Sequence, residues 1–277
     1  MVDVGHVNKK RKKNPQDMGF WEHLEELRWH LVRSFIAIAL GAVFAFMKRD
    51  FIFDTILLGP KTNDFLTIRL LCNLGEKFGI NALCLDNSQL TLINITMSGQ
   101  FTQHIYISLV AGLIIASPYV FYELWRFIKP ALREEELRYS SIAITIVSIL
   151  FIIGILFSYF LIVPLTINFL GNYQVSEMVK NQISLSSYIS TVVGVILSVG
   201  IVFELPALAW MLSRLGIITD KWMRKYRKVM IVMIFIVAAI ITPPDMFSQI
   251  LVAVPLLILY EISIYVAAIA TKKREQN

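Results

Sequence analysis

The chain has 277 residues, a net charge of +6, a hydrophobic fraction of 56% and a mean hydropathy of +0.65. A soluble domain of this length is markedly less apolar, so these values exclude a large soluble core and indicate a membrane protein with several spans. The cations lie in short segments beside apolar runs, which indicates membrane orientation rather than nucleic-acid binding.

The N-terminal residues are strongly basic, and Lys9 to Lys13 form an unbroken run of cations. We expect residues 1–18 to be a disordered cytoplasmic tail. Residues 19–270 are predicted to form a six-helix transmembrane domain that includes the outer loop 48–103. Residues 271–277 are predicted to form a second cytoplasmic tail.

The segment GFWEHLEELRWHLVRSF follows the basic run and turns acidic before the first apolar stretch. One helical stripe holds its apolar side chains, which are Phe20, Leu24, Leu27 and Leu31. Glu22 and Glu26 are one turn apart and share another face, where their repulsion does not stabilise the helix. We therefore expect an interfacial helix whose acidic face is left for a cationic ligand.

Six apolar segments predict six transmembrane helices, because irregular backbone cannot lie in lipid. In chain order they are His30–Met47, His104–Phe127, Ser141–Val163, Tyr188–Leu212, Val229–Ile241 and Gln249–Ala270. The fifth reaches only about 20 Å, whereas the hydrocarbon core is roughly 30 Å thick. Lysine and arginine gather in the N-terminus, the second and fourth loops and the tail, which predicts that both termini are cytoplasmic.

The predicted outer loop contains both cysteines, Cys72 and Cys84. A disulfide on the oxidising side of the membrane is the favoured interpretation, and two buried free thiols are the alternative.

Glu204 lies deep in the fourth span, with apolar residues on both sides and Pro206 after it. A carboxylate at membrane depth is costly and marks a functional site by default. The alternative is a protonated side chain bonded to a carbonyl that the proline kink frees. Glu261 in the sixth span is a second such acid, unless it reaches water at the interface.

The turn TPPDMFSQ before the sixth span contains the helix-ending Pro243 and Pro244. Its polar residues are Asp245, which is also a good helix N-cap, and Gln249. The loop after the second span, FYELWRFIKPALREEELRY, contains Glu134, Glu135 and Glu136. These acids either complement a helix dipole or form a second acidic surface on the cytoplasmic side.

Motifs for enzymatic chemistry are absent: the sequence has no Gly-x-Ser-x-Gly, no His-Glu-x-x-His and no Gly-rich phosphate loop. The histidines, at positions 6, 23, 30 and 104, do not have metal-ligand spacing. We therefore expect no enzymatic activity, no catalytic residue, no cofactor and no metal.

Five stretches in order give the chain its resemblance to the TatC family, the integral receptor of the twin-arginine protein translocase. They are HLEELRWHL, SPYVFYELWRFIKPAL, GILFSYFLIVPLTINFL, GIVFELP and TPPDMFSQ, which together extend from about residue 19 to residue 265. The resemblance implies an all-α membrane protein with six helices in a concave, glove-like arrangement, of which the fifth and sixth are short. Its location would be the bacterial cytoplasmic (inner) membrane.

The resemblance also implies a function. The protein would bind the twin-arginine signal peptides of folded cargo, assemble with single-span TatA and TatB partners, and form a homo-oligomer in a receptor complex. The proton-motive force would drive transport.

The residues that match the family's motifs carry expected roles. Glu26 would recognise the signal peptide, with Leu24 and Arg28 beside it. Glu136 would pair with a signal arginine, although three consecutive glutamates leave Glu135 open for this role. The remaining matches are the cavity-facing Glu204, the partner-docking positions Gln249, Asp245 and Glu261, and the outer-loop Pro60.

Two other functions are alternatives to this one. A proton- or ion-coupled small-molecule transporter would use Glu204, but the chain lacks the internal repeats typical of that class. A structural scaffold without cargo would not need two acidic cytoplasmic surfaces.

Overall fold

The computed structural model describes residues 20–79, 84, 91–128, 140–176, 181–241 and 246–275. These residues are mostly helical. The α-helices are α1 (Phe20–Met47), α2 (Leu66–Phe78), α3 (Gly99–Ile128), α5 (Ser140–Phe157), α6 (Val163–Asn172), α7 (Leu185–Val202), α8 (Leu205–Arg214), α9 (Asp220–Lys225), α10 (Arg227–Ile241) and α11 (Met246–Glu275). Two π-helical segments, η2 (Phe51–Leu57) and η6 (Ser158–Ile162), and the 3-10 turn η3 (Gly59–Lys61) accompany them, with the strands β1 (Leu92–Ile93) and β2 (Ile183–Ser184).

Five helical stretches of the described chain are long and apolar enough to cross a membrane. They are Leu24–Met47, Gly99–Ile128, Ala143–Asn172, Leu185–Arg214 and Val252–Lys272. They coincide with five of the six predicted spans, which confirms the all-α polytopic fold. Large apolar side chains on their outer faces, such as Phe35 and Leu40 of α1, are exposed as lipid-facing residues should be.

The fifth predicted span corresponds to α10, which has 15 residues. It reaches about 22 Å, so its status as a full span stays a prediction. The expectation of a short sixth helix is wrong: α11 has 30 residues. After the predicted end at Ala270, the residues Lys272, Lys273, Arg274 and Glu275 are good helix formers, so the helix continues to Glu275.

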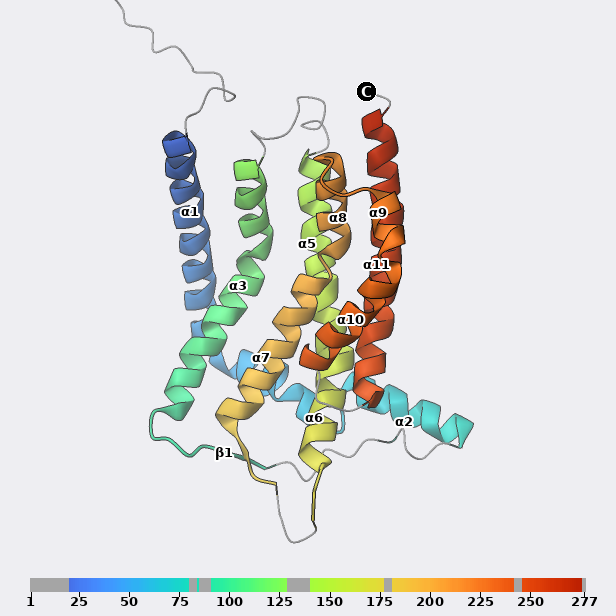
Figure 1. Ribbon diagram of the computed structural model, residues 1–277. Helices are drawn as coiled ribbons and strands as arrows, with labels where there is room; N and C mark the ends of the chain where they lie inside the picture. The colour runs from blue at the N-terminus through green and yellow to red at the C-terminus, as the bar shows by residue number, and fades with distance from the viewer. Residues whose placement is uncertain are drawn as a thin grey trace, which may run out of the picture.

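The helices stand side by side in the order α1, α3 and α5, with α8 beside α5 and α11 beyond it (Figure 1). Both the start of α1 and the end of α11 lie at one end of the bundle. At the opposite end α2 lies across the bundle, and β1 pairs in parallel with β2. The buried apolar core surrounds α7 and α11 and includes Ile189, Val199 and Leu256.

Prolines lie within or between the long helices, among them Pro255 inside α11. In α3, Pro118 has no N–H to donate to the Ile114 carbonyl, and the Ser117 hydroxyl donates to that carbonyl instead, at 2.8 Å. Pro164 opens α6 directly after the π-helical η6. Pro206 lies in the first turn of α8, after a break between Val202 and Leu205, as its position in the sequence predicts.

The end of the bundle that α2 covers is tied together by side chain to backbone hydrogen bonds. The buried Tyr188 hydroxyl of α7 donates to the Leu57 carbonyl at 2.8 Å. Tyr159 donates to the Ile56 carbonyl at 2.9 Å. Ser184 caps α7 by accepting a hydrogen bond from the Ser187 backbone N–H. The two tyrosine bonds hold the segment after α1 against the third and fourth spans, and the Ser184 cap fixes the start of α7.

Two glycines bring α1 and α3 into backbone contact. A Cβ atom on Gly112 would lie 2.7 Å from the Ile38 carbonyl oxygen and 2.8 Å from Ala42 Cα. A Cβ atom on Gly41 would lie 3.0 Å from the Gly112 carbonyl oxygen. Small residues that permit such an approach are the usual basis of helix packing in lipid, where apolar surface alone gives no preference for protein over lipid.

We predict that Gly112→Ala lowers the free energy of unfolding by about 1–3 kcal/mol, because the new methyl group must push two backbones apart. The matched control is Gly194→Ala in α7, where an added Cβ meets nothing within 4 Å. The control should leave stability unchanged or raise it by less than about 1 kcal/mol. Thermal unfolding of the detergent-solubilised variants measures both, and equal effects at the two positions would contradict the close packing.

Candidate functional site

The first turns of α1 carry the residues that the sequence assigned to recognition. Leu24 is 40% exposed and Arg28 is also exposed. The Glu26 side chain is 37% exposed, and its Oε1 lies 4.0 Å from Nε2 of His30, one turn further along. Its other oxygen, Oε2, is shielded from solvent and accepts no hydrogen bond from the described residues. The described chain therefore leaves the hydrogen-bonding capacity of one Glu26 oxygen unsatisfied.

A buried polar network connects this face of α1 to α3. His30 is 5% exposed and Glu123 is 2% exposed, and His30 Nδ1 is hydrogen-bonded to Glu123 Oε2. The Tyr119 hydroxyl donates to Glu123 Oε1 at 2.8 Å, and Arg33 Nη1 lies 4.0 Å from Oε2. Both carboxylate oxygens of Glu123 thus have partners, as a buried charge requires.

Neither Glu123 nor His30 is among the functional residues predicted from the sequence. The signal was present, because Glu123 lies between apolar and aromatic residues within the second span, as Glu204 does within the fourth. What the sequence lacks is the packing of α1 on α3, which brings His30 to Glu123 across 93 positions.

Glu204 lies at the break between α7 and α8 and is 8% exposed. Apart from a weak contact with the backbone of Phe151 in α5, neither of its carboxylate oxygens has a hydrogen-bond partner among the described residues. The structure thus shows no bond from Glu204 to a carbonyl freed by Pro206, which was the alternative interpretation. Glu123 and Glu204 are both buried acids, but the first is paired and the second is not.

Glu204 lines a pocket of about 490 Å³ between α3, α5, α8 and α11. The walls are apolar and aromatic, and Trp125 of α3 stacks on Trp210 of α8 with ring centroids 6.1 Å apart. Arg214 completes one wall, with its guanidinium 5.8 Å from the Trp210 ring centroid. The pocket suits an extended apolar group, and Glu204 and Arg214 are ionisable side chains in its lining.

Two of the predicted partner-docking residues are engaged within the chain. Glu261 of α11 forms a two-pronged ion pair with Arg227 at the start of α10, in which Nε and Oε1 are 2.6 Å apart. This hydrogen bond raises the pKa of Arg227. Gln249 donates to the Phe235 carbonyl of α10 at 3.1 Å. Both contacts join α10 to α11, which gives these residues a structural role that the sequence did not predict.

Several predicted site residues lie outside the described part of the chain. They are Glu135, Glu136, Asp245, Pro243 and Pro244. Their proposed roles are untested. Pro60 lies in η3 and is buried.

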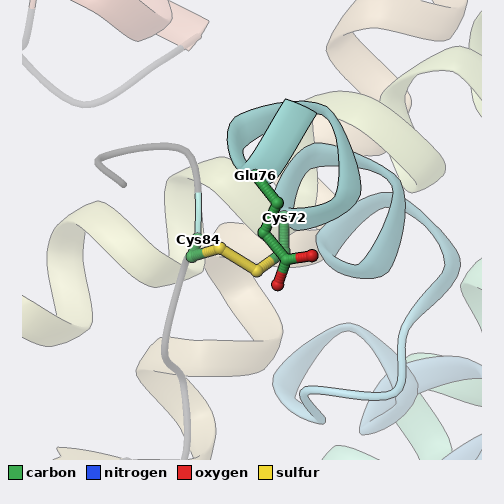
Figure 2. A group of neighbouring side chains, drawn as sticks. All are labelled: Cys72, Glu76 and Cys84. Carbon is green, nitrogen blue, oxygen red and sulfur yellow. A yellow bond between two sulfur atoms is a disulfide. The ribbon is translucent and has the colours of Figure 1, made fainter. Parts of the chain in front are cut away.

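The candidate disulfide is formed: Cys72 of α2 is bonded to Cys84. Glu76, one turn after Cys72, brings its carboxylate to the bond (Figure 2), and the three potential ligand atoms lie within 4.8 Å of one another. Metal ions bind cysteine as the thiolate. Because both sulfur atoms are bonded to each other, the cluster does not offer a metal site in this form.

Comparison with known proteins gives a consistent result. Residues 22–255 match the family model described as Sec-independent protein translocase protein (TatC). The TatC protein of Blattabacterium sp. subsp. Periplaneta americana is 40% identical, over 95% of this chain and 100% of its own length. The TatC protein of Aquifex aeolicus is 36% identical, over 94% of this chain and 98% of its own.

The fold is also similar to a solved structure. A crystal structure of the twin-arginine translocase receptor TatC superimposes with a TM-score of 0.67 and 35% sequence identity. The similarity covers 90% of this chain and 100% of the solved chain.

The two buried acids should respond oppositely to replacement by leucine. Glu204→Leu is expected to raise the free energy of unfolding by about 1–3 kcal/mol, because it removes a buried polar group without a partner. Glu123→Leu is expected to lower it by about 3–5 kcal/mol, because it leaves His30 and Arg33 without their carboxylate. Thermal unfolding in detergent measures both changes. If Glu204→Leu lowers the free energy of unfolding as much as Glu123→Leu does, the distinction between a paired and an unpaired buried acid is refuted.

Proposed function

The chain belongs to the TatC family of Sec-independent protein translocase proteins, and we propose that it binds twin-arginine signal peptides through carboxylates at one end of its bundle. It is a membrane-embedded component of the twin-arginine translocase. The observation that carries the receptor function is the similarity, over 90% of the chain, to a solved twin-arginine translocase receptor.

The binding end is the one where α1 begins, and we place it in the cytoplasm of a bacterium, at the inner membrane. The positive segments of the sequence support this orientation. The start of α1 and the end of α11 lie at the same end of the bundle (Figure 1), as two cytoplasmic termini require.

Glu26 is the first arginine-binding residue in this proposal. Its Oε2 lacks a hydrogen-bond partner among the described residues, and its side chain is partly exposed. A guanidinium binds a carboxylate with two parallel N–H···O bonds, so an arginine side chain supplies the donors that this site lacks. Glu136, or its neighbour Glu135, is the second carboxylate of the proposal.

The apolar part of the signal peptide would occupy the pocket between α3, α5, α8 and α11. Its lining is apolar and aromatic, and its volume of about 490 Å³ fits several side chains. Unpartnered Glu204 would meet the signal peptide or a partner helix there.

TatA- and TatB-type single-span subunits are the proposed partners, with a homo-oligomeric receptor complex and transport driven by the proton-motive force. α10 and α11 are their docking elements in this proposal. α10 is shorter than the bilayer core, so it favours a locally thin membrane. No comparison supports the alternative of a small-molecule transporter that uses Glu204.

Glu26→Gln should reduce crosslinking between α1 and a twin-arginine signal peptide to the level of a Lys-Lys peptide, because it removes the charge that selects guanidinium. A photocrosslinker at the exposed Leu24 reports the contact. Glu25→Gln, an exposed acid next to the site, is the matched control and should crosslink normally. Equal crosslinking of the Arg-Arg and Lys-Lys peptides to the unmodified chain would refute the receptor function of this face.

Charge reversal in the acidic loop tests the second carboxylate. Glu136→Lys should block export of a twin-arginine cargo while the protein stays inserted, because the new cation repels the signal arginine. Glu135→Lys in parallel decides which of the neighbours pairs with it. Export assays with membrane fractionation measure both, and normal export in both variants would contradict the assignment to this loop.

A further inference from the structure

His30 lies between two carboxylates in the part of α1 that the proposed function uses. Its Nδ1 contacts Oε2 of Glu123 in α3, and its Nε2 lies 4.0 Å from Oε1 of Glu26. One imidazole ring thus links a buried acid to the partly exposed acid that is proposed to bind arginine.

The hydrogen bond to Glu123 determines which nitrogen of a neutral His30 carries the proton. An ionised carboxylate only accepts hydrogen bonds, so Nδ1 donates to Glu123 and Nε2 is left with a lone pair. That lone pair faces Glu26. Protonation therefore adds its hydrogen at Nε2, the nitrogen next to Glu26, and places a positive charge there.

The charged groups around His30 in the described chain come from both helices. α1 contributes Glu26 and Arg33, and α3 contributes Glu123, with the Tyr119 hydroxyl bonded to it. The apolar Phe127 ring packs edge-on against the His30 ring, with the ring centroids 6.3 Å apart. With neutral His30 the two carboxylates and one guanidinium sum to −1. With protonated His30 the sum is zero.

We propose that His30 is a positioning residue that makes arginine binding at Glu26 dependent on pH. In its neutral form His30 leaves the Glu26 carboxylate to the incoming guanidinium. In its protonated form Nε2–H and its charge compete for the same carboxylate, so the signal peptide binds less tightly. Histidine is the side chain that changes charge near neutral pH, whereas arginine stays protonated and glutamate ionised there. This inference rests on the proposed function of Glu26.

The test measures binding of a fluorescent twin-arginine signal peptide to the full-length protein in lipid nanodiscs, between about pH 5 and about pH 8. Binding to the unmodified protein should weaken about fivefold toward the acidic end of this range. That loss of affinity corresponds to the free energy of one partly exposed ion pair. His30→Asn keeps a donor near Nδ1 and removes the titrating group, so its affinity should be independent of pH over most of this range. A His30→Asn profile that matches the unmodified protein overturns the proposal.

Glu123→Gln is the second variant, and it serves if His30→Asn does not fold. The amide oxygen can accept from His30 Nδ1 while the amide NH2 donates to the Tyr119 hydroxyl oxygen, so both contacts are kept but the charge that favours imidazolium is removed. The pH profile should therefore shift to lower pH, and an unshifted profile overturns the proposal.

Glu26→Gln separates this inference from the proposed function. If that variant binds the peptide as tightly as the unmodified protein, the function of Glu26 as receptor residue fails. If it loses binding while His30→Asn keeps the full pH dependence, only the role of His30 fails.

Discussion

The contact between α1 and α3 is the interaction on which the recognition face depends, because α1 carries Glu26 and packs mainly against α3. Lipid tails compete for apolar helix surface, so such a contact needs features that lipid cannot reproduce. The structure supplies two of them. Gly41 and Gly112 let the backbones touch, and His30 binds the buried Glu123, so that separating the helices would leave both groups unpaired.

α3 also connects the recognition face to the apolar pocket. Near the end of the helix, Glu123 reaches toward α1, whereas Trp125 two positions later lines the pocket and stacks on Trp210. The two side chains leave the same helix in different directions. A ligand with arginines followed by an apolar segment would therefore extend around the end of α3, which sets the distance between the two parts of the proposed site.

The sequence predicts well what local patterns determine. The lengths of the apolar segments predicted the long spans, and Pro206 predicted the break between α7 and α8. The predicted disulfide between Cys72 and Cys84 is present. The sequence failed where the answer depends on packing between distant segments. The ion pair of Glu261 with Arg227, which lies 34 positions earlier, was not predicted, because only the packing of α10 on α11 brings the two side chains together. The contact between His30 and Glu123 was not predicted for the same reason. The good helix formers after Ala270 made α11 longer than the family resemblance implied.

The packing of α1 has a consequence for the dynamics of the protein. An element opens with a free energy set by the contacts that it breaks, and α1 has one principal neighbour, whereas α7 lies in the core. The outer surface of α1 is already covered by lipid, so detaching the helix exposes only its α3-facing stripe. α1 therefore forms a small cooperative unit that can separate from α3 within the bilayer while the core around α7 stays folded.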